Sequence, residues 1–185
     1  MSETSNGCTA EEKQLVDACM SGDRLALKRL YDTYAQRMMP ICVRYTNDYE
    51  SAKDLLHDGF LKVFSHLGDY RGQGSFDGWM RRIFVNTALE QLRKLTDRPY
   101  MVDVEEARSL SSLDVSVLDK MSMQEILDCI QLLPESYRAV FNMAVLDDYS
   151  HREIAEQLGI TESSSRVYLM RAKQQLQEML SKRMK

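Results

Sequence analysis

The chain has 185 residues, enough for one ordinary domain or two small ones. Its hydrophobic fraction of 44% permits a packed core, and its formal net charge of −4 argues against indiscriminate coating of nucleic acid. Glycine and proline are scarce, at 8 and 3 residues, and methionine is plentiful, at 12, which favours helices over sheets. The composition therefore predicts an all-α protein.

Capping residues predict the first helices. Thr9 with Glu12 forms a capping box, and Asp23 caps a second helix after a Ser-Gly break. Pro40 lacks a backbone N–H, so we expect it to kink or interrupt that second helix. The apolar positions expected along it are Leu25, Leu27, Leu30, Tyr31, Tyr34, Met38 and Ile41.

A third helix is expected from about Glu50 to Leu67, with one apolar and one charged face. The apolar face comprises Ala52, Leu55, Leu56, Phe60, Val63, Phe64 and Leu67. The other face comprises Asp54, His57, Asp58, Leu61 and Lys62. From Asp48 to Tyr70 there are five acids against two lysines, a net of −3. This face is either an ordinary solvated surface or a dock for a basic partner.

A glycine-rich loop, Gly68–Gly74, leads into a fourth helix that Ser75 can cap. The glycines lack the spacing of a dinucleotide fingerprint, and no strand precedes them. Within the helix, Phe76 and Trp79 stand among arginines. Rings beside cations suit unpaired bases, which stack while the cations hold phosphates. The alternative is that the rings belong to the core and the arginines are solvated.

Residues 96–122 lack sustained periodicity and are acidic, so we interpret them as a flexible linker. The predicted organisation is an N-terminal helical domain, residues 1–95, this linker, and a C-terminal helical domain, residues 123–185. In the second domain one helix runs to Leu133, and Pro134 starts the next as its first residue.

The stretch Tyr149–Leu176 predicts a helix-turn-helix. Ser150 opens a capping box with Glu153, Gly159 stops the first helix, and Thr161 caps the second. The second helix would lie in a DNA major groove with its N-terminal residues facing base edges. A helical hairpin inside an all-α core is the alternative. The apolar residues noted on the second helix are Val167, Leu169 and Met170.

Charge is distributed unevenly along the chain. Arg71–Lys94 carries five basic residues against two acidic ones, and Tyr149–Lys185 carries seven against four, a net of +3 each. Between them, Asp97–Asp128 carries eight acidic and three basic residues, a net of −5. Two basic segments around an acidic one indicate two nucleic-acid-facing modules and a tether.

Cysteine spacing, missing catalytic motifs and hydropathy argue against several classes of protein. The four cysteines are scattered and form no Cys-x-x-Cys or Cys/His cluster, so we expect no metal site and no cofactor. No nucleophile–base pair or phosphate loop is visible either, which argues against an enzyme. No signal peptide is visible, and no apolar run approaches the ~20 residues of a membrane helix. We expect a cytoplasmic protein.

Three segments, in this order, are SAKDLLHDGFLKVF, FDGWMRRIFVNTALEQLRK and LPESYRAVFNMAVLDDYSHREIAEQLGITESSSRVYLMRAKQQL. Together they resemble the extracytoplasmic-function (ECF) sigma factors, the small two-domain specificity subunits of bacterial RNA polymerase. The first is similar to the family's core-polymerase-binding helix. The second resembles the segment that melts and reads the minus-ten element, and the third resembles the domain that reads the minus-thirty-five element.

The resemblance implies site residues and partners. The residues implied to bind core polymerase are Asp54, His57, Asp58 and Leu61. Those implied to bind the minus-ten element are Arg71, Gln73, Phe76, Trp79, Arg82, Asn86 and Arg93. Those implied to bind the minus-thirty-five element are Ser163, Ser164, Ser165, Arg166, Arg171 and Lys173. No catalytic residue is implied. The implied partners are core RNA polymerase, promoter DNA and an anti-sigma factor, without membrane insertion. The alternative function is a stand-alone helix-turn-helix transcriptional regulator.

Overall fold

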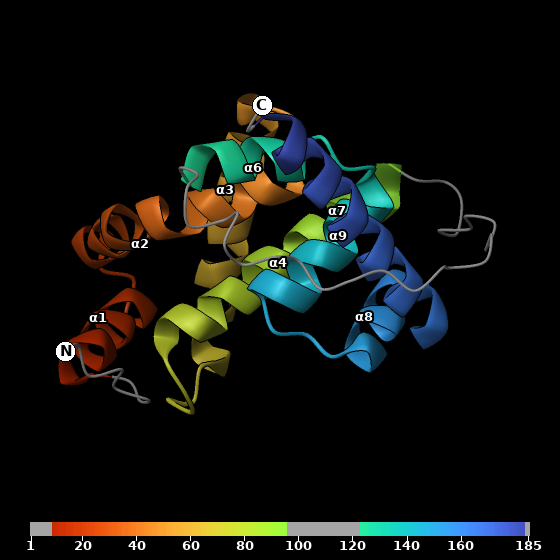
Figure 1. Cartoon of the computed structure of the whole chain (residues 1–185). Helices are drawn as coiled ribbons and strands as arrows, with labels where there is room; N and C mark the ends of the chain where they lie inside the picture. Colours follow the sequence, from red (N-terminus) through yellow and green to blue (C-terminus); the bar gives the residue numbers. More distant parts are fainter. Residues whose placement is uncertain (1–8, 96–122, 184–185) are drawn as a thin grey trace. The chain divides into compact units, whose positions relative to one another are not determined.

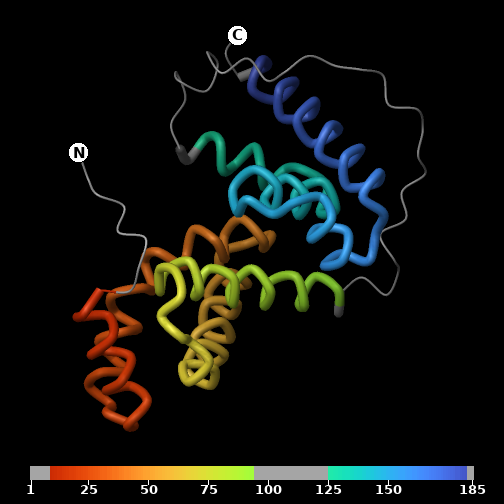
Figure 2. Tube along the Cα trace, turned by 90° about the horizontal axis from the view of Figure 1, so that it is seen from below, coloured from red at the N-terminus to blue at the C-terminus, as the bar shows by residue number. Residues whose placement is uncertain are grey.

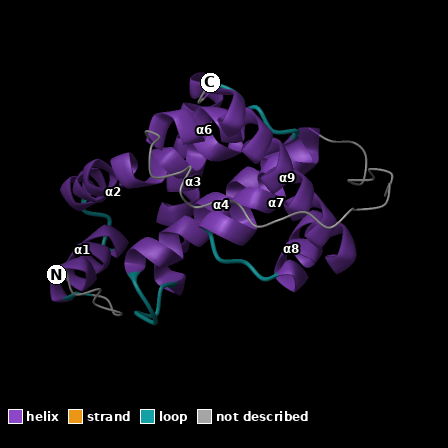
Figure 3. Cartoon of the chain, in the orientation of Figure 1, coloured by secondary structure: helices purple, strands orange, loops and turns teal. Residues whose placement is uncertain are grey.

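The computed structural model describes residues 9–95 and 123–183, and within those ranges every regular element is a helix (Figures 1 and 3). The all-α prediction is confirmed. The chain divides into two compact units, Met1–Glu90 and Gln91–Lys185, so the division falls inside the fourth helix. The boundary expected at residue 95 stays a prediction, and the expected linker lies outside the described residues.

The first unit is built from four α-helices and one short 3₁₀ turn. They are α1 (Ala10–Met20), α2 (Arg24–Tyr45), α3 (Tyr49–His66), η1 (Leu67–Asp69) and α4 (Phe76–Leu95). The predicted caps are present: Thr9 and Glu12 form the capping box, and Asp23 accepts from the N–H groups of Leu25 and Ala26. Asp48 caps α3 by accepting from the N–H of Ser51 at 2.8 Å.

The core of the first unit lies where α3 meets α2 and α4. Phe60 of α3 and Phe84 of α4 meet edge to face with their centroids 5.4 Å apart. Gly59 allows this approach, because a Cβ on that residue would lie 2.2 Å from Cε1 of Phe84. Among the described residues of α3, the apolar face is buried as predicted apart from Phe64, which is half-buried.

Pro40 does not interrupt α2, which runs from Arg24 to Tyr45, and the proline lies on the exposed side. The expected kink at Pro40 stays a prediction. At that position the carbonyl that proline leaves without an N–H partner belongs to exposed Gln36, so water can satisfy it. Leu25, expected in the core, is 78% exposed, and Tyr31 is 39% exposed.

The second unit contains α6 (Met123–Gln131), α7 (Glu135–Phe141), a π turn η2 (Asn142–Leu146), α8 (His151–Leu158) and α9 (Glu162–Arg183). Helix α9 packs along α6, α7 and α8, as the tube in Figure 2 shows. Pro134 is the N-cap of α7 and not its first residue, a shift of the kind that helix ends commonly show. The π turn was not predicted.

The helix-turn-helix prediction is confirmed. Ser150 and Glu153 form the capping box of α8, and Gly159 ends that helix in the left-handed conformation at φ 67°. Thr161 then caps α9, its Oγ1 accepting from the N–H of Ser164 at 3.0 Å. The buried face of α9 differs from the apolar residues noted in the sequence, which are half-buried. Its buried residues are Ser165, Tyr168, Ala172, Leu176 and Leu180.

Candidate nucleic-acid and polymerase interfaces

Four residues form one exposed line along α3. Asp54, His57, Asp58 and Leu61 are spaced three and four positions apart, so they share a helix face, and all four are exposed. Leu61 is 54% exposed, a large apolar side chain one turn after His57 and Asp58. An apolar centre with a polar rim is the usual anatomy of a protein interface. We call these four residues the α3 row.

Three aromatic rings form a cluster at the start of α4. Phe76 and Trp79 are stacked with centroids 5.5 Å apart, and Tyr70 lies 5.0 Å from Phe76 and 5.3 Å from Trp79. The hydroxyl of Tyr70 donates to the carbonyl of Gly74 at 2.9 Å, which ties the Tyr70 ring to the far end of the loop. Gly72 and Gly74 have φ of 70° and 81°, a conformation that favours glycine. A hydrogen bond and two glycine conformations within the loop therefore account for its shape.

The residues expected at the minus-ten element divide into five exposed residues, one half-buried residue and one buried residue. Phe76 is 1% exposed, so its assignment as a DNA contact is corrected: its ring lies in the core and supports Trp79 from below. Trp79 is half-buried. The exposed members are Arg71, Gln73, Arg82, Asn86 and Arg93.

The first turn of α9 carries the hydroxyls expected at the minus-thirty-five element. Thr161 Oγ1 lies 2.8 Å from the hydroxyls of both Ser163 and Ser164. Ser165 is fully buried, and its hydroxyl lies 2.8 Å from Nδ1 of His151 on α8. Ser165 is therefore corrected from a DNA contact to a contact between the two helices of the motif.

The basic residues of α9 lie in different surroundings. Arg166 is exposed and pairs with Glu162 one turn earlier at 2.9 Å. Arg171 is half-buried, and its Nη1 donates to the hydroxyl of Tyr137 on α7 at 3.1 Å. Lys173 is half-buried. Arg166 is therefore the most exposed of the three basic residues expected at the minus-thirty-five element.

Sequence reasoning missed Tyr70 and His151. Tyr70 was read only as part of a loop, and a tyrosine four residues before a glycine is no recognised signal for loop closure. His151 has no sequence signal that sets it apart, and only folding brings it to Ser165, fourteen positions away. Among the described residues, no three metal-binding side chains gather at one place. No helix in the described ranges combines the length and apolarity that crossing a membrane requires.

The surroundings of His151 lower its pKa from the usual 6.5, chiefly through burial and then through the positive charges of Arg166 and Lys173, against an opposing effect of Glu162. The unfolded chain therefore binds more protons in mild acid than the folded chain. The stability contributed by neutral His151 is fully present above its ordinary pKa and is lost as the pH falls through the folded-state pKa.

We therefore expect the chain to melt at a lower temperature at about pH 5.5 than at about pH 7.5, and His151→Gln to reduce that difference. Glutamine removes the titration and can still hydrogen-bond Ser165. Circular dichroism melts at both pH values measure the effect. Gln174→Asn, a neutral substitution at an exposed position of α9 in the same unit, is the control and should leave the pH difference as it is. A His151→Gln variant with the full pH difference would contradict the assignment.

Taken together, the two units define a DNA-binding protein: one carries a helix-turn-helix, and the other carries aromatic rings among exposed arginines. Comparison with known proteins agrees. Residues 30–98 match the family described as Sigma-70 region 2, and residues 123–176 match Sigma-70, region 4.

Curated relatives align with this chain over most of both lengths. The RNA polymerase sigma-H factor of Pseudomonas aeruginosa is 26% identical, over 92% of this chain and 94% of the relative. The ECF RNA polymerase sigma-E factor of Escherichia coli K12 is 27% identical, over 88% and 91%. The fold is shared with the sigma factor RpoE of Bartonella quintana, solved in complex with the anti-sigma factor NepR, at TM-score 0.51 and 18% identity over 83% of this chain and 96% of that chain. The chain belongs to the sigma-70 family and is a sigma factor of the extracytoplasmic-function class.

Proposed function

We propose that this sigma factor binds core RNA polymerase through the α3 row and directs it to promoters through two DNA-reading surfaces. The aromatic cluster and the exposed arginines of the first unit take the unpaired minus-ten strand. The first turn of α9 reads the minus-thirty-five duplex in the major groove. Two modest DNA contacts on one chain reinforce each other, because binding by one raises the effective concentration of the other.

The single observation that carries this proposal is the ring cluster of Tyr70, Phe76 and Trp79, tied to the glycine-rich loop by the hydrogen bond from Tyr70 to Gly74. A stand-alone helix-turn-helix regulator binds duplex DNA and has no use for a platform that accepts unstacked bases. Holding a base outside the DNA double helix costs on the order of a few kcal/mol, and stacking of the base on aromatic rings can offset that cost. The first unit therefore favours an initiation factor.

Transcription in vitro tests the proposal. Core RNA polymerase is supplied with genomic DNA fragments, with and without the purified chain, and the transcript starts are mapped. Discrete starts that require the chain are expected. The opposing result is a chain that binds two-fold symmetric duplex sites without polymerase and produces no new starts, as a stand-alone regulator would.

Arg166→Ala is expected to weaken binding at one or two minus-thirty-five positions by about 1–3 kcal/mol, the usual share of a bidentate arginine–guanine contact. Release from Glu162 frees the guanidinium for this contact. Holoenzyme binding to a panel of single-base promoter variants measures the effect. Lys182→Ala, an exposed cation at the far end of α9, is the control. A loss spread evenly over all sequences would mark Arg166 as a phosphate contact instead.

We also propose that the protein acts in the cytoplasm, that it catalyses no reaction itself, and that an anti-sigma factor restrains it. The fold comparison supports the last point only by analogy, since the Bartonella protein was solved with such a partner. Co-purification from the native bacterium under non-inducing growth tests it. Recovery of the chain with core polymerase alone under those conditions would count against an anti-sigma partner.

A further inference from the structure

Two arginines from different helices of the first unit share one carboxylate. Asp77, in the first turn of α4, accepts from Nε of Arg81 at 2.5 Å. Its other oxygen lies 3.7 Å from Nη1 of Arg37 on α2. The side chain of Asp77 is 24% exposed, whereas those of Arg37 and Arg81 are 59% and 46% exposed. The carboxylate is thus the inner member, and the guanidinium groups form the outer surface.

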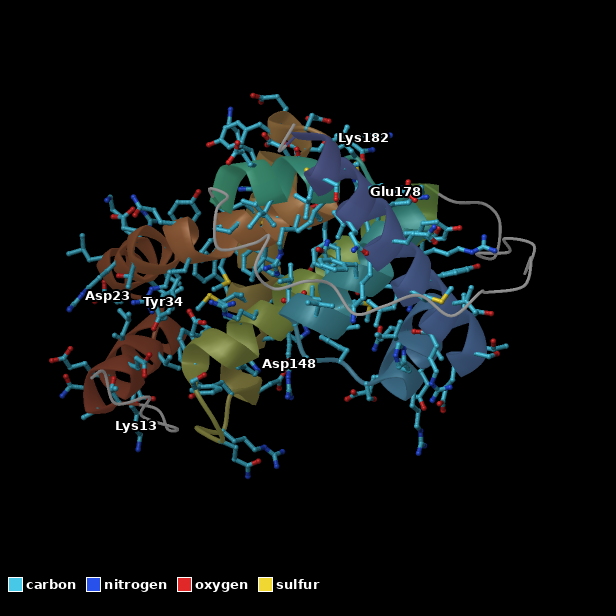
Figure 4. All side chains as sticks on the ribbon, viewed as in Figure 1. Lys13, Asp23, Tyr34, Asp148, Glu178 and Lys182 are labelled. Atoms are coloured by element: carbon cyan, nitrogen blue, oxygen red, sulfur yellow. The ribbon has the colours of Figure 1, made fainter. Side chains whose placement is uncertain are left out.

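A ring underneath restrains the first of these arginines. The guanidinium carbon of Arg37 lies 5.4 Å from the centroid of the Tyr34 ring, a cation–π distance. Tyr34 is itself buried, and its hydroxyl donates to Glu12 of α1 at 2.9 Å (Figure 4 labels Tyr34). Arg37 therefore stands on a fixed support, which lowers the entropy that it would lose on binding a ligand.

The same support leads to the aromatic cluster. Tyr34 meets Phe76 edge to face with centroids 5.4 Å apart, and Phe76 is stacked on Trp79 at 5.5 Å. Arg37 and Trp79 thus lie at two ends of one continuous series of rings. The paired arginines and the aromatic cluster are therefore parts of one connected group of side chains.

The arginines keep donors for an anion. Arg81 donates to Asp77 through Nε, so its two Nη groups have no acceptor within the described ranges. Arg37 likewise has Asp77 as its one ion-pair partner among the described side chains. The three groups together carry a net charge of +1. Two guanidinium groups close enough to share a carboxylate can also share the two free oxygens of a phosphodiester.

We propose that Arg37 and Arg81, held together and oriented by Asp77, form a binding site for one backbone phosphate of single-stranded DNA. This inference rests on the proposed function, because it places the phosphate on the strand whose bases reach the aromatic cluster. The site reads no sequence; it fixes the position of the strand, as phosphate contacts do. Asp77 prevents the two cations from spreading apart and keeps their forks facing outward.

The salt dependence of binding tests this site directly. Each phosphate neutralised on a single strand adds about 0.7 to the slope of log affinity against log salt concentration. The double variant Arg37→Ala/Arg81→Ala is therefore expected to lower the slope by about 0.7. Between 1 M and 0.1 M salt, its affinity should then rise about fivefold less than the affinity of the wild-type chain does. The sample is holoenzyme reconstituted with the full-length chain, and the probe is a fluorescein-labelled single-stranded oligonucleotide of mixed sequence.

Matched variants separate the site from general charge. Arg24→Ala/Arg29→Ala removes two exposed arginines from the same helix, α2, and should leave the slope unchanged. Arg37→Lys/Arg81→Lys keeps both charges and should retain most of the slope while weakening binding. An equal loss of slope in the Arg24/Arg29 variant would overturn the proposal. So would an equal loss with duplex DNA as the probe, since the site is assigned to a single strand.

Failure here and failure of the proposed function are distinguishable. Gel filtration of the chain with core polymerase first shows whether holoenzyme forms at all. If it forms and the arginine pair leaves the slope unchanged, the phosphate site is wrong and the sigma function stands. If no holoenzyme forms, the proposed function is wrong, and the free full-length chain titrated with the same oligonucleotide still decides the phosphate site.

Discussion

Gly59→Ala is expected to destabilise the first unit by about 1–3 kcal/mol, the usual cost of an added methyl group in a filled core. The new Cβ would lie 2.2 Å from Cε1, 2.6 Å from Cδ1 and 2.7 Å from Cζ of Phe84. Phe84 is fully buried and meets Phe60 edge to face, so its ring cannot swing away without disturbing a second ring. The higher helix propensity of alanine, worth up to about 1 kcal/mol, offsets only part of this cost.

Urea unfolding followed by the fluorescence of Trp79 measures the effect, because Trp79 is the chain's single tryptophan and lies in the first unit. The transition midpoint should fall while the slope of the transition stays the same. Gly68→Ala is the control: its Cβ would meet nothing closer than the flexible end of Met20 at 3.9 Å, so the midpoint should hardly move.

A second variant isolates the contact itself. Phe84→Leu removes the ring edge that the new methyl group would strike, so it should make Gly59→Ala less costly. The double variant is then more stable than the sum of the two single changes predicts, by about 0.5–3 kcal/mol for residues in contact. Additive effects would show that the cost of Gly59→Ala arises elsewhere, and would contradict the close helix approach.

The helix starts could be predicted because their chemistry is local. Thr9, Asp23, Ser150 and Thr161 each bond a backbone N–H two or three positions further on. Such contacts depend on nearest neighbours and not on the rest of the fold. Gly159 belongs to the same class, since its left-handed conformation ends α8 without any distant partner. The helix-turn-helix was therefore recognisable from the sequence.

The burial of α9 could not be predicted because two apolar series compete along it. Val167, Leu169 and Met170 look like a core stripe in the sequence but are half-buried. The face that folds inward is set by α6, α7 and α8, which pack against α9 and meet Tyr168 and Ser165. A serine at the centre of that face is tolerated because His151 supplies a hydrogen-bond partner.

The candidate sites likewise have features with local causes, which the sequence predicts, and features set by packing, which it does not. The exposure of the α3 row could be predicted because α3 has one unambiguous apolar face, which leaves the opposite face to solvent. The burial of Phe76 could not be predicted, because an aromatic residue beside arginines has the same sequence pattern whether its ring is exposed or packed in the core. Only the packing of Tyr34 and Trp79 around it distinguishes the two.

Asp54→Arg is expected to weaken holoenzyme assembly by at least about 30-fold, or 2 kcal/mol, because it places like charges opposite each other in an interface. The position is exposed in the middle of an acidic helix face, so the folded unit should tolerate the change. The loss should appear in the association rate as well, since rim charges steer the encounter of oppositely charged surfaces. Surface-immobilised core polymerase, titrated with wild-type and variant chains, measures both quantities.

Asp17→Arg makes the same charge change on an exposed position of α1 in the same unit, and it separates the interface from net charge. If the α3 row is the docking surface, Asp17→Arg retains wild-type assembly while Asp54→Arg loses it, and raising the salt concentration narrows the gap. Leu61→Ala should add a loss that salt does not relieve, because the exposed leucine contributes apolar area and no charge. Equal losses for Asp17→Arg and Asp54→Arg would remove the α3 row from the interface, and the polymerase contact would then have to lie on another helix.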